Sequence, residues 1–185
     1  MDDDGANDTL TIDQAYAAWT PTDNMKLTFG KMPNPLRLDN AVWDTEYTPE
    51  GVAYNYTYEL SQNHKFSFAM GGIFVDESSG DSSDAYAGLA QVTLDSVLTS
   101  KLSSYLGVAA YNLFNKESAL EDGGGNKGNT GGDAPTNNMN PFIVDGALTY
   151  KLDSFPMYPG AFPISVGGTY INNPGADNKE EGYLV

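Results

Sequence analysis

The segment between Pro33 and Gly51 carries the densest group of side chains that could act on a passing solute. Its charged residues and tryptophan are Arg37, Asp39, Trp43, Asp44, Glu46 and Glu50. Opposed charges across a narrow aqueous passage orient dipolar solutes and set ion preference through the local field. One arginine against four acids predicts a mild cation preference for this stretch. The alternative is an ordinary external loop that Trp43 and Pro35 hold in place.

A second polar set falls on segments of alternating polarity and would face water there. Its members are Lys26, Asn55, Glu59, Lys65, Asp145 and Lys151. Opposite charges that face each other on adjacent strands stabilise a sheet, so these residues could form cross-strand ion pairs along the wall of a channel. The alternative is the plain water-facing polarity of any half-exposed sheet.

Catalytic and metal chemistry find little support in the sequence. The single histidine, His64, lies in a predicted turn, the chain has no cysteine, and no nucleophile-elbow, zinc-protease, dinucleotide or P-loop motif occurs. The stretch from Glu121 to Asp133 lacks the acid spacing of an EF-hand and is interpreted as a surface loop. Nine Lys and Arg residues and a net charge of -16 disfavour a nucleic-acid partner. We expect no enzymatic activity and no cofactor.

The elements that must position these residues are segments of period-two hydrophobicity, which predict strands. The eight candidates are Leu10–Thr20, Met25–Met32, Val52–Ser61, Lys65–Val75, Ala85–Asp95, Leu102–Phe114, Phe142–Asp153 and Ile164–Asn173. The clearest, Val52–Ser61, puts Val, Tyr and Leu on one face and Ala, Asn, Thr, Glu and Ser on the other. Such strands separate an oily environment from a wet one.

The links between these segments alternate between short and longer. Residues 21–24, 62–64 and 96–101 form short links, whereas 33–51, 76–84 and 115–141 form longer ones. Residues 154–163 form a Pro-rich link of moderate length, and the residues after Asn173 belong to an acidic loop. Tight turns at one rim and long loops at the other are typical of a transmembrane β-barrel. The predicted fold is therefore all-β: a partial, antiparallel up-and-down transmembrane β-barrel of about eight strands.

Two observations bear on the membrane and on local structure. No stretch of about eighteen apolar residues exists, which excludes a spanning helix, but barrel strands need only about ten alternating residues. A helical spacing of three and four residues runs from Leu94 to Leu106 and competes with the strand assignment. Alternation at Gln91, Thr93 and Asp95 favours a turn at residues 98–101 instead.

The polarity of the links also predicts where the chain ends lie. With eight strands, both ends fall on the loop rim, whereas closed outer-membrane barrels have an even strand number and keep their ends on the turn rim. We expect residues 1–185 to be an internal fragment of one barrel domain that lacks terminal strands at both ends and a signal peptide. The intact barrel would then have about ten strands or more. Eight strands enclose an interior that side chains just fill, whereas about sixteen leave an aqueous channel, and the small polar inward residues suit a wet interior better than a packed one.

Residues 12–51 resemble the putative porins of Gram-negative outer membranes. The features shared with that family are a strand ending in an aromatic residue and proline, a strand ending in Gly-Lys, a Trp-Asp pair and a Glu-Gly start to the next strand. They correspond to Trp19, Pro21, Gly30, Lys31, Trp43, Asp44, Glu50 and Gly51. The resemblance implies a bacterial outer-membrane location, contact with membrane lipid and a channel function.

Three hypotheses follow from these patterns. The leading one is a water-filled porin through which ions and small hydrophilic solutes diffuse passively. A soluble or cell-surface β-sandwich that binds a ligand such as carbohydrate is the rival, and an adhesin or structural barrel is the third. A sandwich would bury the apolar face against a second sheet. The tyrosines at 54, 56 and 58, predicted to point outward at mid-strand, suggest contact with a sister barrel in a homotrimer.

Overall fold

The computed structural model describes residues 12–39, 42–43, 47–76, 84–115, 138–154, 160–176 and 180–185. The strands are β1 (Ala15–Thr22), β2 (Met25–Lys31), β3 (Glu50–Ser61), β4 (His64–Asp76), β5 (Ala85–Val97), β6 (Leu102–Phe114), β7 (Phe142–Leu152), β8 (Phe162–Asn172) and β9 (Glu181–Leu184). Within these ranges, no helix is long and apolar enough to cross a membrane.

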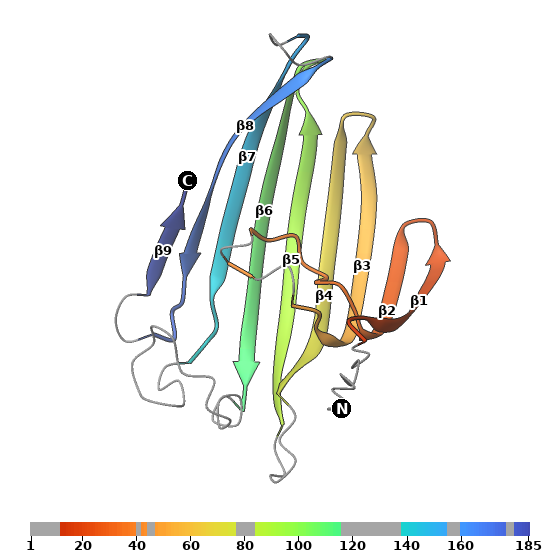
Figure 1. Ribbon diagram of the computed structural model, residues 1–185, viewed down its shortest axis with the longest axis vertical. Coiled ribbons are helices and arrows are strands. Elements are labelled where there is room, and N and C mark those ends of the chain that lie inside the picture. The colour runs from red at the N-terminus through yellow and green to blue at the C-terminus, as the bar shows by residue number, and fades with distance from the viewer. Residues whose placement is uncertain are drawn as a thin grey trace, which may run out of the picture.

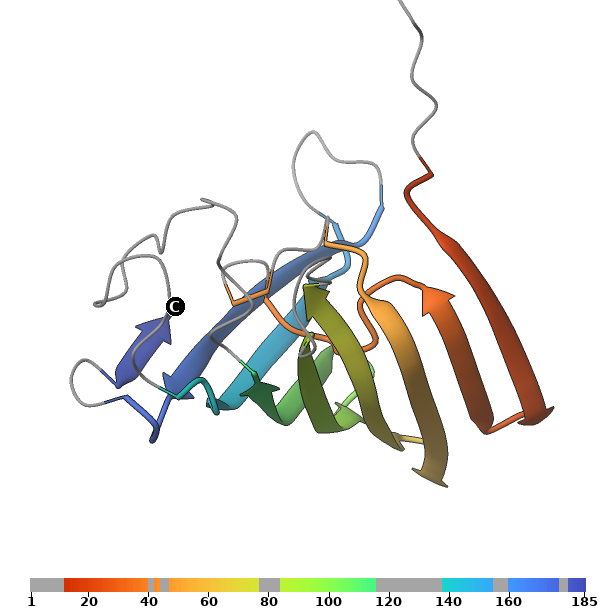
Figure 2. The ribbon, with the colours of Figure 1, turned by 90° about the horizontal axis from the view of Figure 1, so that it is seen from below.

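Each strand pairs antiparallel with its neighbours in sequence, so the sheet runs in order from β1 to β9 (Figure 1). The sheet is curved, and its edge strands β1 and β9 do not pair with each other (Figure 2). This arrangement confirms the predicted all-β, antiparallel up-and-down fold, with an open sheet that corresponds to part of a barrel.

The links between β1 and β7 confirm the predicted alternation, and the link between β7 and β8 departs from it. Two-residue turns, Asp23–Asn24 and Gln62–Asn63, join β1 to β2 and β3 to β4, and residues 98–101 join β5 to β6. These turns lie at one end of the sheet, which we call the turn end, while the links 32–49, 77–84 and 115–141 leave from the opposite, loop end (Figure 1). The link between β7 and β8, residues 153–161, lies at the turn end but is about as long as the 77–84 link at the loop end.

Alternation of side chains gives the sheet an apolar outer face and a more polar inner face. Large apolar residues of the outer face are 38% to 65% exposed: Val52, Met70, Val92, Leu148 and Val166. Tyr54, Tyr56 and Tyr58 also lie on this face, opposite Met70, Phe68 and Phe66 of β4. The described residues form one sheet and supply no second layer over the apolar face. A β-sandwich would need that layer, so the structure does not favour it.

The ninth strand differs from the sequence expectation, which left the residues after Asn173 in an acidic loop. Residues 181–184 pair with the free edge of β8 from Thr169 to Asn172. Four residues that begin with a glutamate are too few to show an alternation of polar and apolar side chains. The strand is instead defined by its backbone hydrogen bonds to β8.

The helical spacing between residues 94 and 106 belongs to two strands, as the alternation at β5 indicates. Leu94 of β5 and Leu106 of β6 lie directly opposite each other in the register. Between them, the N–H groups of Leu98 and Thr99 donate to the carbonyl oxygen of Leu102 over 2.9 and 3.0 Å. The spacing of four therefore joins outer-face residues on either side of a turn, such as Leu94 and Leu106, while Tyr105 lies on the inner face.

Candidate functional site

The link between β2 and β3, residues 32–49, crosses the inner face of the sheet (Figures 1 and 2). We call it the inner segment. Its ends meet, because the Met32 N–H donates to the Pro49 carbonyl oxygen over 2.8 Å. Gly30, just before it, has a φ of +107°, and a Cβ there would lie 2.5 Å from the backbone oxygen of Ala15. Only glycine suits this exit from β2.

The part of the inner segment around Leu36 and Trp43 packs on apolar residues. Leu36 is 5% exposed and belongs to a buried cluster with Ala69, Ile73, Ala87 and Leu89 of β4 and β5. Trp43 packs against this cluster and meets the Tyr111 ring edge-on, with centroids 5.5 Å apart. Burial of a leucine-sized side chain contributes roughly 1.5–3 kcal/mol. The burial of these apolar side chains therefore holds this part of the segment on the sheet.

The part around Arg37 is held by directional hydrogen bonds. The Arg37 N–H donates to Oε1 of Gln91 over 2.7 Å, and Nε2 of Gln91 donates to the Arg37 carbonyl oxygen over 2.6 Å. The Tyr105 hydroxyl also donates to that oxygen, at 3.2 Å, and Nδ2 of Asn55 donates to the Pro35 carbonyl oxygen at 3.3 Å. Gln91 is 3% exposed, and its buried side-chain amide finds both of its hydrogen-bond partners on the backbone of Arg37.

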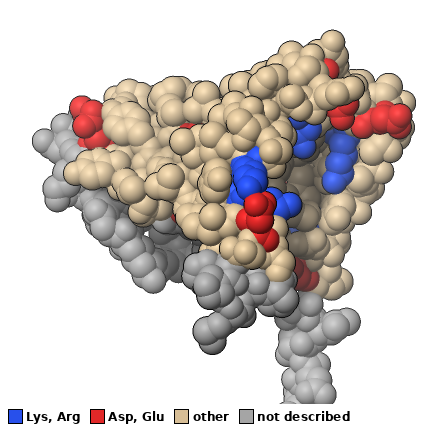
Figure 3. Space-filling model, turned by 90° about the horizontal axis from the view of Figure 1, so that it is seen from above, with Lys and Arg blue, Asp and Glu red and all other residues tan. Residues whose placement is uncertain are grey.

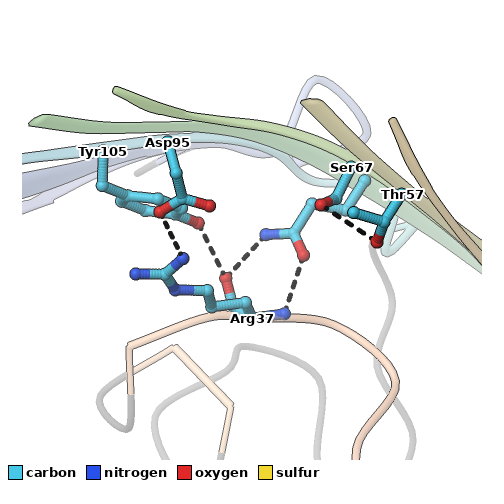
Figure 4. Close-up of polar contacts among 6 residues, drawn as sticks. Arg37, Thr57, Ser67, Asp95 and Tyr105 are labelled. Carbon is cyan, nitrogen blue, oxygen red and sulfur yellow. Dashed lines mark hydrogen bonds and ion pairs between the residues drawn. The ribbon is translucent and has the colours of Figure 1, made fainter. Parts of the chain in front are cut away.

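The guanidinium of Arg37 is oriented by two residues of the sheet (Figure 4). Its Nη1 lies 2.9 Å from Oδ1 of Asp95, and its central carbon lies 3.9 Å from the centre of the Tyr105 ring. The arginine side chain is 61% exposed. An exposed ion pair contributes at most about 1 kcal/mol, so Asp95 and Tyr105 chiefly set the direction of the positive charge.

The register of the strands arranges the inner face in rows. Glu59, Lys65, Asp95 and Tyr105 form a row near the turn end. The next row towards the loop end is Thr57, Ser67, Thr93, Gly107, Asp145 and Thr169. Asn55, Ala69, Gln91 and Ala109 follow, and the rows beyond them contain the apolar cluster. The inner segment thus crosses where polar rows give way to apolar ones.

Hollows flank the inner segment, and Arg37 lines three of them. The first, of about 340 Å³, also has Glu59, His64, Lys65 and Asp95 in its wall. The second, of about 270 Å³, lies over the Thr57 and Ser67 row, and the third, of about 450 Å³, is lined by Asp39 and Asp145. Seen from the turn end, basic side chains gather around a hollow with acidic side chains beside them (Figure 3).

The structure places the other predicted residues of the inner segment as follows. Asp39 is exposed, and its carbonyl oxygen accepts hydrogen bonds from the N–H groups of Val42 and Trp43. Glu50 is exposed at the start of β3, opposite Lys31 in the register. Asp44 and Glu46 lie outside the described residues, as do residues 121–133.

The residues predicted to face water lie on the inner face of their strands. Lys26 and Asn55 line a further hollow of about 270 Å³ beside Pro33–Pro35. Glu59 and Lys65 are opposite each other in the register. In the part of the chain that the structure describes, the ion pairs within 4 Å are Arg37–Asp95 and Lys101–Asp153, so none joins two members of the predicted set.

Asp145 and Lys151 complete that set on β7. Asp145 is 8% exposed and lies opposite Gly107 of β6, where an added Cβ would clash with its Oδ1. Gly107 therefore leaves room for a buried carboxylate at this point. Lys151 is exposed near the turn end and lines none of the hollows described above.

Titratable groups outside the spanning strands respond to their surroundings in two places. At the turn end, the hydrogen bond and negative charge of Asp153 raise the pKa of Lys101. On the inner segment, burial raises the pKa of the Tyr47 phenol, whose hydroxyl donates to the Phe74 carbonyl oxygen at 3.4 Å. Both groups keep their usual charge at neutral pH.

Sequence reasoning did not single out Gln91, Asp95 and Tyr105 as parts of the site. Their inward positions could be inferred from alternation, since Gln91 and Asp95 lie four residues apart on one face of β5. The loop residue that they contact, Arg37, lies 54 to 68 residues away from them along the chain. No local sequence pattern encodes contacts over such a separation.

Comparison with known protein families identifies the family to which the chain belongs. The sequence profile of a family described as "putative porin" matches residues 1–158, which include the inner segment and strands β1 to β7. No curated protein and no solved structure matches the chain.

Proposed function

Since the chain belongs to the putative porin family, we propose that it forms part of the wall of a water-filled channel in the outer membrane of a Gram-negative bacterium. Ions and small hydrophilic solutes pass through this channel by passive diffusion. The passage involves no chemical step and no cofactor.

The two-faced sheet is the observation that carries this proposal. Its outer face presents exposed Val, Met, Leu, Phe and Tyr side chains, while Lys, Glu, Asn, Ser and Thr lie on the inner face. Backbone groups within a membrane must be satisfied by hydrogen bonds, and a sheet achieves this between its strands. Lipid outside and water inside is the environment that suits both faces.

The inner segment acts in this proposal as the narrowing of the channel. It crosses the inner face between the turn and loop ends, and it directs the exposed Arg37 guanidinium towards Asp95. A fixed positive charge beside a fixed negative charge creates a local field that sorts ions and orients dipolar solutes.

Conductance in planar lipid bilayers tests the proposal. We expect stepwise current increases as single channels insert, and currents that fall when neutral solutes small enough to enter the channel replace part of its water, but not when the solutes are too large to enter. Detergent buffer without protein is the control. Repeated insertions that carry no current would leave only a structural role for the protein.

A matched pair of lysine substitutions tests which face meets lipid. Val166 and Ser165 are adjacent exposed residues of β8 that point to opposite faces. Val166→Lys should destabilise the protein folded in vesicles, lowering its free energy of unfolding by about 2–4 kcal/mol if residue 166 lies near mid-bilayer. Ser165→Lys should be tolerated, because residue 165 faces water. Urea titrations of both variants measure the difference, and equal tolerance would contradict a lipid-facing outer surface.

A further inference from the structure

Three hydroxyl side chains form a row on neighbouring strands beside the inner segment. Thr57 of β3 is opposite Ser67 of β4, which is opposite Thr93 of β5. The hydroxyl oxygens of Thr57 and Ser67 are 3.4 Å apart (Figure 4). All three residues line the second hollow, of about 270 Å³. This row offers several hydrogen-bond donors to a molecule in that hollow.

Two cationic side chains line the same hollow. Arg37 and Lys65 face one acid, Asp95, and so the charged lining of this hollow has an excess of one positive charge. This excess stands out in a chain whose net charge is -16. Arg37 meets Asp95 through Nη1, and because a guanidinium carries further N–H donors, it can bind a second acceptor at the same time.

The adjoining hollows have a different charge balance. In the first, Glu59 joins Asp95, so two acids match Arg37 and Lys65. In the third, Asp39 and Asp145 outnumber Arg37. An anion is therefore favoured in the second hollow and disfavoured in the third, although both lie against the same arginine.

We propose that the second hollow is a binding subsite for small carboxylate solutes on their way through the channel. The carboxylate is held by the Arg37 guanidinium and the Lys65 ammonium, and the hydroxyls of Thr57, Ser67 and Thr93 donate to its oxygens or to polar groups beside it. Arginine matches the planar carboxylate with two parallel donors, which favours this anion over a spherical one. The inference rests on the proposed channel function and names a class of solute for it.

Interruption of single-channel current by glutarate, with neutral glutaramide as the matched probe, tests the subsite. In potassium chloride, we expect glutarate to interrupt the current at concentrations where glutaramide does not. Arg37→Gln should raise the half-blocking concentration of glutarate by about tenfold or more and Lys65→Gln by about threefold or more, because each removes a charge-assisted hydrogen bond. Ser67→Ala should have a smaller effect.

The matched control is Lys151→Gln, which removes the same charge from the inner face away from every described hollow. It should leave the half-blocking concentration unchanged. The Arg37 variant keeps the inner segment in place, because the hydrogen bonds of Gln91 and Tyr105 to the backbone of residue 37 do not depend on the guanidinium.

Two results would overturn the subsite. One is equal interruption by glutarate and glutaramide; the other is a loss of block in Lys151→Gln as large as that in Lys65→Gln, which would indicate a general effect of lumen charge. Both require a conducting channel, so they are distinct from a failure of the proposed function, in which no current is seen at all.

Discussion

The two parts of the inner segment are attached to the same sheet by different kinds of contact. Around Leu36 and Trp43, the attachment is apolar and buried, on a cluster that includes Ile73 and Leu89. Around Arg37, it is a set of hydrogen bonds from Gln91 and Tyr105, with an ion pair to Asp95. The hydrophobic effect has no direction, whereas hydrogen bonds fix distance and angle.

This difference indicates a division of roles. Apolar burial supplies the larger free energy and keeps the segment on the sheet. The polar contacts add less free energy, but they determine where along the inner face residue 37 sits and where its charge points. Substitutions in the first part should therefore release the segment, and substitutions in the second should leave it docked and alter its effect on ions.

The largest effect is expected for Leu36→Ala. Removal of a buried leucine side chain costs about 2–5 kcal/mol, depending on how far the cavity collapses. We expect a lower free energy of unfolding in urea and a larger mean conductance, since the segment is no longer held against β4 and β5. Leu98→Ala, in an exposed turn, is the control and should change neither quantity. An unchanged conductance in Leu36→Ala would show that the polar contacts alone hold the segment.

An intermediate effect is expected for Gln91→Leu. The substitution keeps the side-chain volume but leaves the N–H and carbonyl groups of Arg37 without the amide, at a cost of about 1–3 kcal/mol. We expect a current of similar mean size with larger fluctuations, because the segment remains docked by its apolar part but residue 37 is no longer fixed. Gln62→Leu, at the turn end, is the comparison variant. A current in Gln91→Leu that fluctuates no more than in the unsubstituted protein would mean that the hydrogen bonds of Tyr105 and Asn55 are sufficient to fix the position of residue 37.

The smallest effect on stability, and a clear one on selectivity, is expected for Asp95→Asn. The exposed ion pair contributes at most about 1 kcal/mol, so unfolding in urea should hardly change. Loss of the negative charge beside Arg37 should shift the reversal potential in a potassium chloride gradient towards anion preference. Asp153→Asn removes an equal charge at the turn end, where Asp153 pairs with Lys101, and should shift the reversal potential less. Equal shifts would show that only the total charge of the wall matters.

Much of the fold could be predicted from the sequence, because side-chain alternation and link lengths are local properties. The faces of β3 and β4 and the turn at residues 98–101 are examples. Strand β9 escaped prediction since residues 181–184 are defined by pairing with β8. The length and charges of the inner segment marked it as a candidate functional site. Pro35 and Trp43 do hold it, as the alternative interpretation expected, but against the inner face.

The partners of Arg37 could not be predicted for a physical reason. Gln91, Asp95 and Tyr105 reach residue 37 only when β5 and β6 lie in the register that the whole sheet establishes. A shift of one residue would turn all three away from the inner segment. Trp43 shows the same limit, since its aromatic ring could equally well have faced solutes, yet it packs on Tyr111.

The hydrogen bond between Met32 and Pro49 gives the inner segment the character of an interchangeable module. Its two ends leave and rejoin the sheet at neighbouring points, Gly30 and Gly51, which are directly opposite each other in the register of β2 and β3. Exchange of residues 33–48 for a shorter or differently charged stretch should therefore change what the molecule admits while the surrounding wall keeps its architecture. On the proposed channel function, permeability can be diversified at this position, in nature or in the laboratory, without redesign of the strands.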